Sequence, residues 1–199
     1  MKLLTAVCLA ALAAPLNVRA RTFDFSFDQF RAALDGKIRE AMTDEAQADA
    51  STTRSCKKVK DAHVCTFNDA GFRAMVAGFE RLGVVNGRFE QKLHLRAETQ
   101  GGKVGAIQVI GTRADPVNLL QFVGAVLNVV QVLDPTAATP TPGAGATLAL
   151  VEELGLTRGD GAEDVGGPVA TTKPYALIRC LTMSSRVTPG VGCVFQPRS

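Results

Sequence analysis

The sequence predicts an α+β fold, with an antiparallel sheet of about five to seven strands packed against three or four helices and stapled by two disulfide hairpins. Three observations predict it. From Phe89 to Glu98 the side chains follow a period of two, and Gly101-Gly102 is a tight turn after which residues 104–112 return as the partner strand, as in a β-hairpin. Residues 117–133 form an uncharged apolar run of helical length. Four cysteines beyond residue 20 are spaced as two hairpin pairs.

The first 20 of the 199 residues predict a cleavable export signal. Met1-Lys2 precede an apolar run that ends at Leu16, and Val18-Arg19-Ala20 places small residues at the two positions that a signal peptidase reads. A membrane anchor needs about 20 apolar residues, more than this run contains. Val7 before Cys8 does not fit a lipidation site. We therefore expect cleavage after Ala20 and a single α+β domain over residues 21–199.

Charge and composition narrow the function classes. The chain has 22 Lys and Arg against 19 Asp and Glu, and removal of Lys2 and Arg19 leaves 20 basic residues and a net charge of about +1. A nearly neutral protein lacks the basic face that nucleic acid requires. The Ala-, Arg- and Gly-rich composition favours a bacterial source. We expect a periplasmic or secreted protein that does not bind nucleic acid.

The domain should begin with an extended segment and a helix. Phe23, Phe25 and Phe27 alternate with polar residues. Ser26 and Gln29 fit a capping box, and Phe25 and Phe30 fit a hydrophobic staple. Apolar residues then recur at helical spacing, at Phe27, Phe30, Leu34, Ile38 and Met42.

Further elements follow in order along the chain. A second helix, capped by Asn68 or Asp69, is expected to end at Gly83. The period-two pattern then puts Phe89, Leu93, Leu95 and Ala97 on one strand face. Asp115-Pro116 should start a third helix that ends near Leu133. A short helix near residues 148–154 and closing strands at residues 175–181 and 191–195 complete the prediction.

The apolar third helix could be read as a membrane span or as a core helix. Residues 117–133 would extend about 26 Å at 1.5 Å per residue, short of a hydrocarbon core of about 30 Å. Polar and small residues, among them Asn118 and Gln121, gather on one stripe of this helix. We expect a core helix with a wetter stripe and no stable membrane insertion.

The cysteine spacing predicts the disulfide pairing. Cys56 and Cys65 are symmetric about Lys60-Asp61, and Cys180 and Cys193 are symmetric about residues 186–187. Nearest-neighbour bridges across two hairpins follow, in an oxidising compartment. Zinc sites favour shorter Cys spacings, and a Cys-x-x-Cys redox motif does not occur.

The sequence offers no motif for catalysis or metal binding. His63 and His94 lack a nucleophile elbow or a zinc-helix partner and are read as surface histidines. The acidic loop at residues 160–164 lacks the ligand order of a calcium site, and Glu152-Glu153 would diverge on a helix. We expect no catalytic residue, metal ligand or cofactor, although dispersed active-site residues stay open.

Arg54, Lys57, Lys58 and Lys60 crowd the first cysteine hairpin, and Lys58 and Lys60 are expected on one strand face. Lysines on an edge strand discourage aggregation. They can also form a candidate patch for an anionic partner, such as phospholipid headgroups or an acidic protein.

We therefore expect a non-catalytic binding or interaction protein of the bacterial cell envelope, whose partner is an envelope protein or another macromolecule. The alternatives are a periplasmic carrier of an apolar ligand and a hydrolase with dispersed active-site residues. The two cysteine hairpins also echo one another, so a diverged duplication with its seam near residue 115 stays open.

Overall fold

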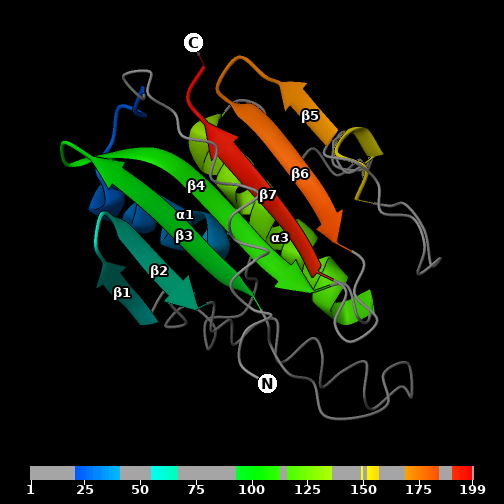
Figure 1. Ribbon diagram of the computed structural model, residues 1–199. Helices are drawn as coiled ribbons and strands as arrows, with labels where there is room; N and C mark the ends of the chain where they lie inside the picture. The colour runs from blue at the N-terminus through cyan, green and yellow to red at the C-terminus, as the bar shows by residue number, and fades with distance from the viewer. Residues whose placement is uncertain are drawn as a thin grey trace, which may run out of the picture.

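The computed structural model describes residues 21–40, 55–66, 93–112, 116–135, 149, 152–156, 169–183 and 190–198. Seven strands form one sheet in the order β1-β2-β3-β4-β7-β6-β5 (Figure 1). The strands are β1 (Ser55–Val59), β2 (Ala62–Thr66), β3 (His94–Gln100), β4 (Lys103–Thr112), β5 (Val169–Thr172), β6 (Leu177–Met183) and β7 (Gly190–Gln196). The long helices are α1 (Phe27–Glu40) and α3 (Pro116–Leu133).

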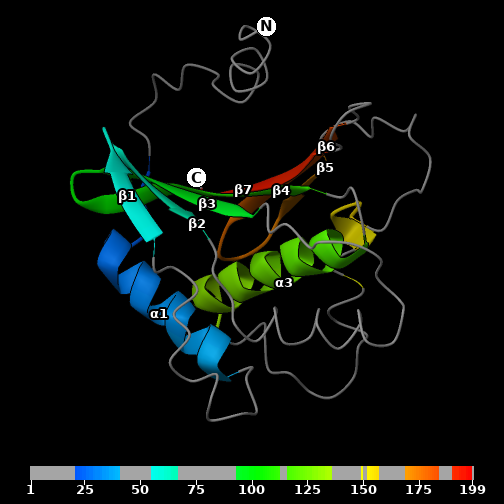
Figure 2. The ribbon, with the colours of Figure 1, turned by 90° about the horizontal axis from the view of Figure 1, so that it is seen from below.

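Every neighbouring pair of strands is antiparallel. Both helices lie on the same side of the sheet (Figure 2). The strand count is at the upper end of the expected range. The described residues contain two long helices and a short helical turn at Glu152-Glu153, fewer than the three or four helices expected. The helix expected between Asp69 and Gly83 lies outside the described residues.

The start of α1 follows from local hydrogen bonding. The Gln29 N–H donates to Ser26 Oγ at 3.3 Å, and the Ser26 N–H donates to Gln29 Oε1 at 2.8 Å. This is the expected capping box, which satisfies backbone donors that a helix start leaves free. The rings of Phe25 and Phe30 stack with centroids 5.8 Å apart, which confirms the hydrophobic staple.

The segment before α1 runs beside the sheet. The Phe23 N–H donates to the Val104 carbonyl at 2.7 Å, and the Val104 N–H donates to the Phe25 carbonyl at 3.0 Å. Lys103 and Asp24 form an ion pair next to these bonds. The chain bends at Asp24-Phe25 and forms no strand, so the expected extended start is not found, but these bonds fix the start of α1 against the β3–β4 hairpin. The turn of that hairpin is Gly101-Gly102, with φ of 59° and 81°, the left-handed values that glycine adopts without strain.

The core lies between the sheet and the two helices. Phe30, Leu34 and Ile38 of α1 and Phe122, Val126 and Val129 of α3 are buried against the sheet. The face of the sheet that meets them includes Leu95, Ile107, Val109, Ile178 and Phe195. Burial of this apolar area, at roughly 25 cal/mol per Å², is the main source of stability.

Helix α3 begins and ends where the sequence predicts, but its polar stripe differs from the prediction. Asn118 and Gln121 are each only 6% exposed, so this part of the expected wetter stripe is buried. The reason is that α3 is covered widely around its axis: no residue of α3 whose side chain is described is exposed. Such all-round burial is typical of a core helix. Among the described residues, no helix is long and apolar enough to span a membrane.

The closing part of the sheet contains one strand more than the sequence predicts. β6 and β7 match the two expected closing strands within two residues at each end. β5 precedes them and pairs with β6, with Val169 opposite Cys180 and Thr172 opposite Leu177. The short helix ends as predicted, because the Gly155 N–H donates to the Glu152 carbonyl and Gly155 has a φ of 67°.

Candidate functional site

The β1–β2 hairpin forms one edge of the described sheet. Val59 pairs with Ala62, so the turn between the strands consists of Lys60 and Asp61. Lys60 has a φ of 55°, in the left-handed region that favours glycine. The Asp61 carbonyl accepts hydrogen bonds from the Thr99 N–H at 2.7 Å and from Thr99 Oγ1 at 3.1 Å. The turn is therefore held against β3 by its backbone, while its side chains point to solvent.

The disulfide Cys56–Cys65 spans this hairpin. The two residues lie directly opposite one another, with an S–S distance of 2.07 Å and a Cα–Cα distance of 4.0 Å. The symmetric spacing about Lys60-Asp61 predicts this pairing, and the structure confirms it. Cys65 is buried and lies opposite Leu95 of β3, so the disulfide is on the face of the sheet that the helices cover.

The second disulfide, Cys180–Cys193, also pairs as predicted. It joins β6 and β7 with an S–S distance of 1.98 Å, and both cysteines are buried. Cys193 lies opposite Val109 of β4, on the same helix-covered face as the first disulfide. Both bridges are therefore part of the hydrophobic core and have a structural role.

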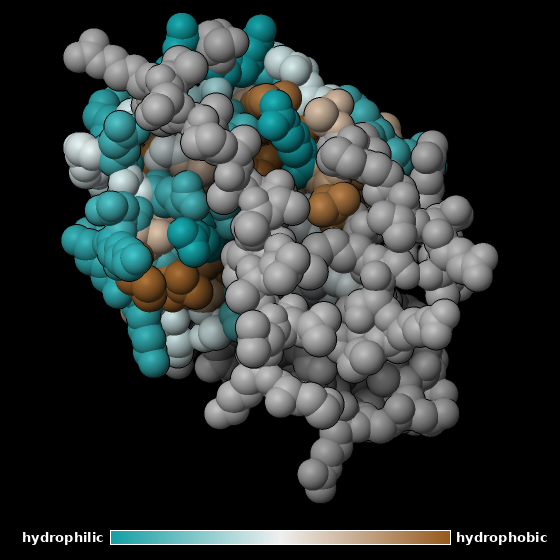
Figure 3. All heavy atoms as spheres, viewed as in Figure 1, coloured by the Kyte–Doolittle hydropathy of each residue, from teal (hydrophilic) through white to brown (hydrophobic). Residues whose placement is uncertain are grey.

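Alternation along β1 distributes its lysines over both faces of the sheet. Lys58 shares the helix side with Cys56, whereas Lys57 and Val59 point to the opposite side. Lys57, Lys58 and Lys60 are all exposed, and Val59 is 51% exposed. The expectation that Lys58 and Lys60 share a strand face is wrong, because Lys60 lies in the turn. In the view of Figure 3, hydrophilic residues gather over this edge of the molecule.

We call this surface the basic hairpin and define it as β1, β2 and the exposed side chains of Lys57, Lys58 and Lys60. Within the part of the chain that the structure describes, none of these three lysines forms an ion pair. Lys103 and Lys173, by contrast, are paired with Asp24 and Glu153. The fourth basic residue of the expected patch, Arg54, lies outside the described residues.

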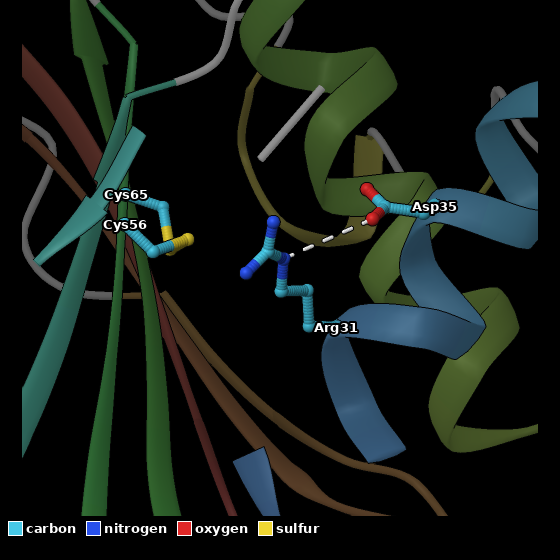
Figure 4. The surroundings of a disulfide bond; sticks show 4 residues. All are labelled: Arg31, Asp35, Cys56 and Cys65. Atoms are coloured by element: carbon cyan, nitrogen blue, oxygen red, sulfur yellow. Dashed lines mark ion pairs between the residues drawn. A yellow bond between two sulfur atoms is a disulfide. The ribbon is translucent and has the colours of Figure 1, made fainter. Parts of the chain in front are cut away.

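Helix α1 packs against the basic hairpin. The ring of His63 stacks on Phe27 with centroids 3.9 Å apart and an interplanar angle of 9°. Figure 4 shows the Cys56–Cys65 disulfide directed toward α1, where Arg31 and Asp35 form an ion pair at 3.9 Å. His63 is therefore half-buried between β2 and α1, and its interpretation as a surface histidine is wrong. The surface reading holds for His94, which is exposed.

Among the acidic candidates, Glu153 has structural partners. Lys173 Nζ donates to Glu153 Oε2 at 2.5 Å, and Thr171 donates to the same carboxylate. The hydrogen bond from Lys173 holds the pKa of Glu153 below its ordinary value, with Thr171 adding to the effect. Burial raises the pKa of the nearby Tyr175 to about 12, and the charges of Asp134 and Glu153 act in the same direction. These hydrogen bonds join the short helix to β5, so the carboxylate of Glu153 has a structural role.

Among the described residues, no three His, Cys, Asp or Glu side chains lie close enough together to hold a metal ion. The acidic loop at residues 160–164 lies outside the described residues. No protein family, curated protein or solved structure matches this chain.

Two properties of the basic hairpin could not be predicted from the sequence. The edge position of β1 depends on the order of all seven strands, which local patterns do not encode. The left-handed conformation of Lys60 follows from the tight register of the two-residue turn. The symmetric placement of Cys56 and Cys65 about Lys60-Asp61 does indicate the register of the two strands. A two-residue turn between strands in that register favours a positive φ.

Proposed function

We propose that the chain is an exported, non-catalytic binding protein of the cell envelope, and that the basic hairpin binds an acidic protein partner. One observation carries the proposal: Lys57, Lys58 and Lys60 are exposed within four residues and have no ion-pair partner among the described residues. Unpaired like charges at one edge repel one another and create a local positive potential, which attracts an anionic partner and orients its approach.

The placement of the lysines favours a protein over a membrane surface. Lys57 and Lys58 point to opposite faces of the sheet, and Lys60 extends from the turn at the end of the hairpin. A flat layer of lipid headgroups can meet one of these directions at a time. An acidic protein segment that follows the edge can reach all three.

The backbone of Lys60 supports a role for its charge. A left-handed conformation costs a non-glycine residue about 1–2 kcal/mol, and glycine, asparagine or aspartate would occupy this turn at a lower cost. Strained residues of this kind concentrate at functional sites. Lys60→Gly should therefore raise the unfolding temperature and weaken partner binding, a combination that a purely structural role for Lys60 does not produce.

Capture from an envelope fraction tests the proposal. The immobilised native chain should retain a partner that mass spectrometry identifies, and K57E/K58E should weaken that capture about tenfold, equivalent to roughly 1.4 kcal/mol. The matched control is R179E/R198E, which reverses two exposed charges elsewhere and changes the net charge by the same amount. Capture should also weaken as salt rises. Equal losses in both double variants, or none in either, would refute a specific role for the basic hairpin.

The exported state is a separate part of this proposal and rests on residues 1–20 and on the two disulfides, which persist in oxidising compartments. The mature chain should begin at Arg21, with no free thiol at Cys56, Cys65, Cys180 or Cys193. N-terminal sequencing and thiol titration of protein recovered from the envelope measure both. A chain that still begins at Met1, or that begins at Cys8, would contradict cleavage after Ala20.

A further inference from the structure

The face of the sheet opposite α1 and α3, which we call the outer face, bears two cations in one row of paired residues. Lys57 lies opposite Val64 of β2, and Val64 lies opposite Arg96 of β3. Directly paired residues share a face, so all three side chains are on the outer face. Both described helices lie on the other side of the sheet (Figure 2). Neighbouring strands are about 4.8 Å apart, which places the Cα atoms of Lys57 and Arg96 roughly 10 Å apart.

Apolar side chains lie between and beside these two cations. Val59 follows Lys57 by two residues and shares its face. It is the one large hydrophobic side chain that is exposed among the described residues, at 51%. Val64, between Lys57 and Arg96, is half-buried. Figure 3 views the outer face and shows hydrophobic atoms among hydrophilic ones over β1 and β2. An apolar centre with a polar rim is the usual organisation of a protein–protein interface.

Arg96 has donors that the described residues do not satisfy. Its Nε lies 3.3 Å from Glu98 Oε1 but has no hydrogen-bond partner. Glu98 Oε1 instead accepts a hydrogen bond from Gln108 Nε2 at 3.4 Å. The Arg96 side chain is 38% exposed, so a group from solvent can reach it. An unmade hydrogen bond at a buried donor costs free energy, and a guanidinium binds a carboxylate through two N–H groups at once. Arg96 is therefore suited to bind a carboxylate of another molecule.

We propose that the partner's acidic segment extends from the basic hairpin across the outer face, with one carboxylate at Lys57, one at Arg96, and an apolar side chain between them on Val59 and Val64. The inference rests on the proposed function. It specifies which face of the sheet the partner covers and how its recognition groups are spaced.

The distances fit an extended segment. Alternate side chains of an extended chain share a face, and residues four apart are about 13 Å apart at 3.3 Å per residue. The long side chains of Lys57 and Arg96 can lean outward by the few ångströms that separate this length from their Cα spacing. Glu98 lies in the neighbouring row, opposite Ala62, and repels a carboxylate placed there. The outer face therefore selects the pattern acidic-x-apolar-x-acidic.

Two peptides of identical composition test the spacing. The probe is Thr-Glu-Thr-Val-Thr-Glu-Thr with blocked ends, added to the full mature chain and followed by NMR titration. The control, Thr-Thr-Thr-Val-Glu-Glu-Thr, has the same residues with adjacent carboxylates. We expect the probe to bind at least about fivefold more tightly and to shift the amide signals of Val64 and Arg96. Equal affinities of the two peptides would overturn the inference.

Variants on the outer face test the two ends of the row separately from its length. Arg96→Gln should weaken binding of the probe about fivefold. The matched control is Arg179→Gln, because Arg179 is exposed in the same row but on β6, three strands beyond Arg96. It should leave the affinity unchanged, and equal losses in both variants would overturn a contact at Arg96.

Val59→Thr tests the apolar contact and does not depend on the Arg96 variant folding. Threonine keeps the β-branched shape, and Val59 is exposed, so the unfolding temperature should stay the same. Binding of the probe should weaken about threefold. Unchanged affinity would show that the peptide does not cover Val59 and would overturn the inference.

The outcomes distinguish this inference from the proposed function. Probe binding that is lost in K57E/K58E but kept in both Arg96→Gln and Val59→Thr would overturn the outer-face contact and leave the basic hairpin as the docking surface. A probe that does not bind the native chain would also overturn the inference, while partner capture lost in K57E/K58E would still support the proposed function.

Discussion

Gly111, near the end of β4, lies close to Phe122 of α3. A Cβ atom at this position would lie 3.0 Å from Phe122 Cδ2 and 3.4 Å from Leu93 Cδ1. Phe122 is fully buried and Leu93 is 4% exposed, so neither side chain can move aside into solvent. The glycine is therefore required by close packing and not by backbone conformation.

We predict that Gly111→Ala destabilises the protein by about 1–3 kcal/mol, the usual cost of overpacking a core. Gly105→Ala is the matched control on the same strand, because its Cβ would meet its nearest neighbour, the Glu98 carbonyl oxygen, at an ordinary 3.9 Å. Thermal or urea unfolding measures both variants. Equal stability of the two would show that Phe122 does not press on the strand at Gly111.

Residues whose role depends on near neighbours in the chain could be predicted from the sequence. Ser26 and Gln29 form their capping box within one helical turn, and Gly101-Gly102 closes a two-residue turn. Gln121 shows the opposite case. Its helical position predicts a wetter surface, yet its amide is buried and both polar atoms have no hydrogen-bond partner in the described structure. What covers a helix is set by distant segments, which periodicity does not reveal.

At the scale of elements, the two disulfides occupy different positions in one sheet. Cys56–Cys65 joins the terminal strand β1 to β2, whereas Cys180–Cys193 joins β6 to β7, and each of those strands has another neighbour. The sequence separations of 9 and 13 residues give similar loop-closure entropies, about 3 kcal/mol for each bridge. Any difference in how much the two bridges stabilise the protein must therefore come from their surroundings.

We predict that C180A/C193A lowers the unfolding temperature more than C56A/C65A does. Both inner cysteines are buried, so their removal adds a cavity to the lost entropy, whereas Cys56 is half-buried. C56A/C65A should instead speed amide exchange locally in β1 and β2, because β1 has no second neighbour in the described sheet. Calorimetry with site-resolved exchange measures both effects. A larger loss of global stability in C56A/C65A than in C180A/C193A would contradict this prediction.

Strands with strong local signals were predictable, and a strand without one was not. The first strand of the β3–β4 hairpin lies within an alternating segment, and a glycine turn follows it, so both strands could be located. β5 contains only Val169-Ala170-Thr171-Thr172, a segment too short for its sequence to indicate a strand. Its pairing with β6 supplies the stability that its short sequence does not indicate.

At the scale of the whole molecule, the two halves of the chain meet between β4 and β7. Ile107 lies opposite Phe195, and Val109 lies opposite Cys193, residues separated by more than 80 positions. No local pattern predicts such a pairing, so the sequence indicates an α+β fold without its strand order. This central pairing also places β1 at the edge, and the candidate site therefore depends on the global topology more than on its own residues.

The packing at this centre decides between a binding protein with a filled core and a carrier with an internal chamber. Phe195, Ile178 and Val109 on the sheet and Phe122 of α3 are fully buried. The close approach of Phe122 to Gly111 leaves no space between α3 and this part of β4. A chamber for an apolar ligand would need roughly 300 Å³ or more, and it would forgo the dispersion contacts that these side chains make.

We therefore predict that the protein purified from its envelope carries no lipid and that native mass spectrometry gives the mass of the mature chain alone. Phe122→Ala provides the positive control, because it should open an apolar cavity at a cost of about 3–5 kcal/mol. Such cavities take up small apolar probes, so xenon or benzene should stabilise the Phe122→Ala variant and leave the native chain unchanged. Bound lipid on the native chain, or equal stabilisation of both proteins by the probe, would mean that the native structure already contains a ligand chamber. The carrier function would then replace the proposed one.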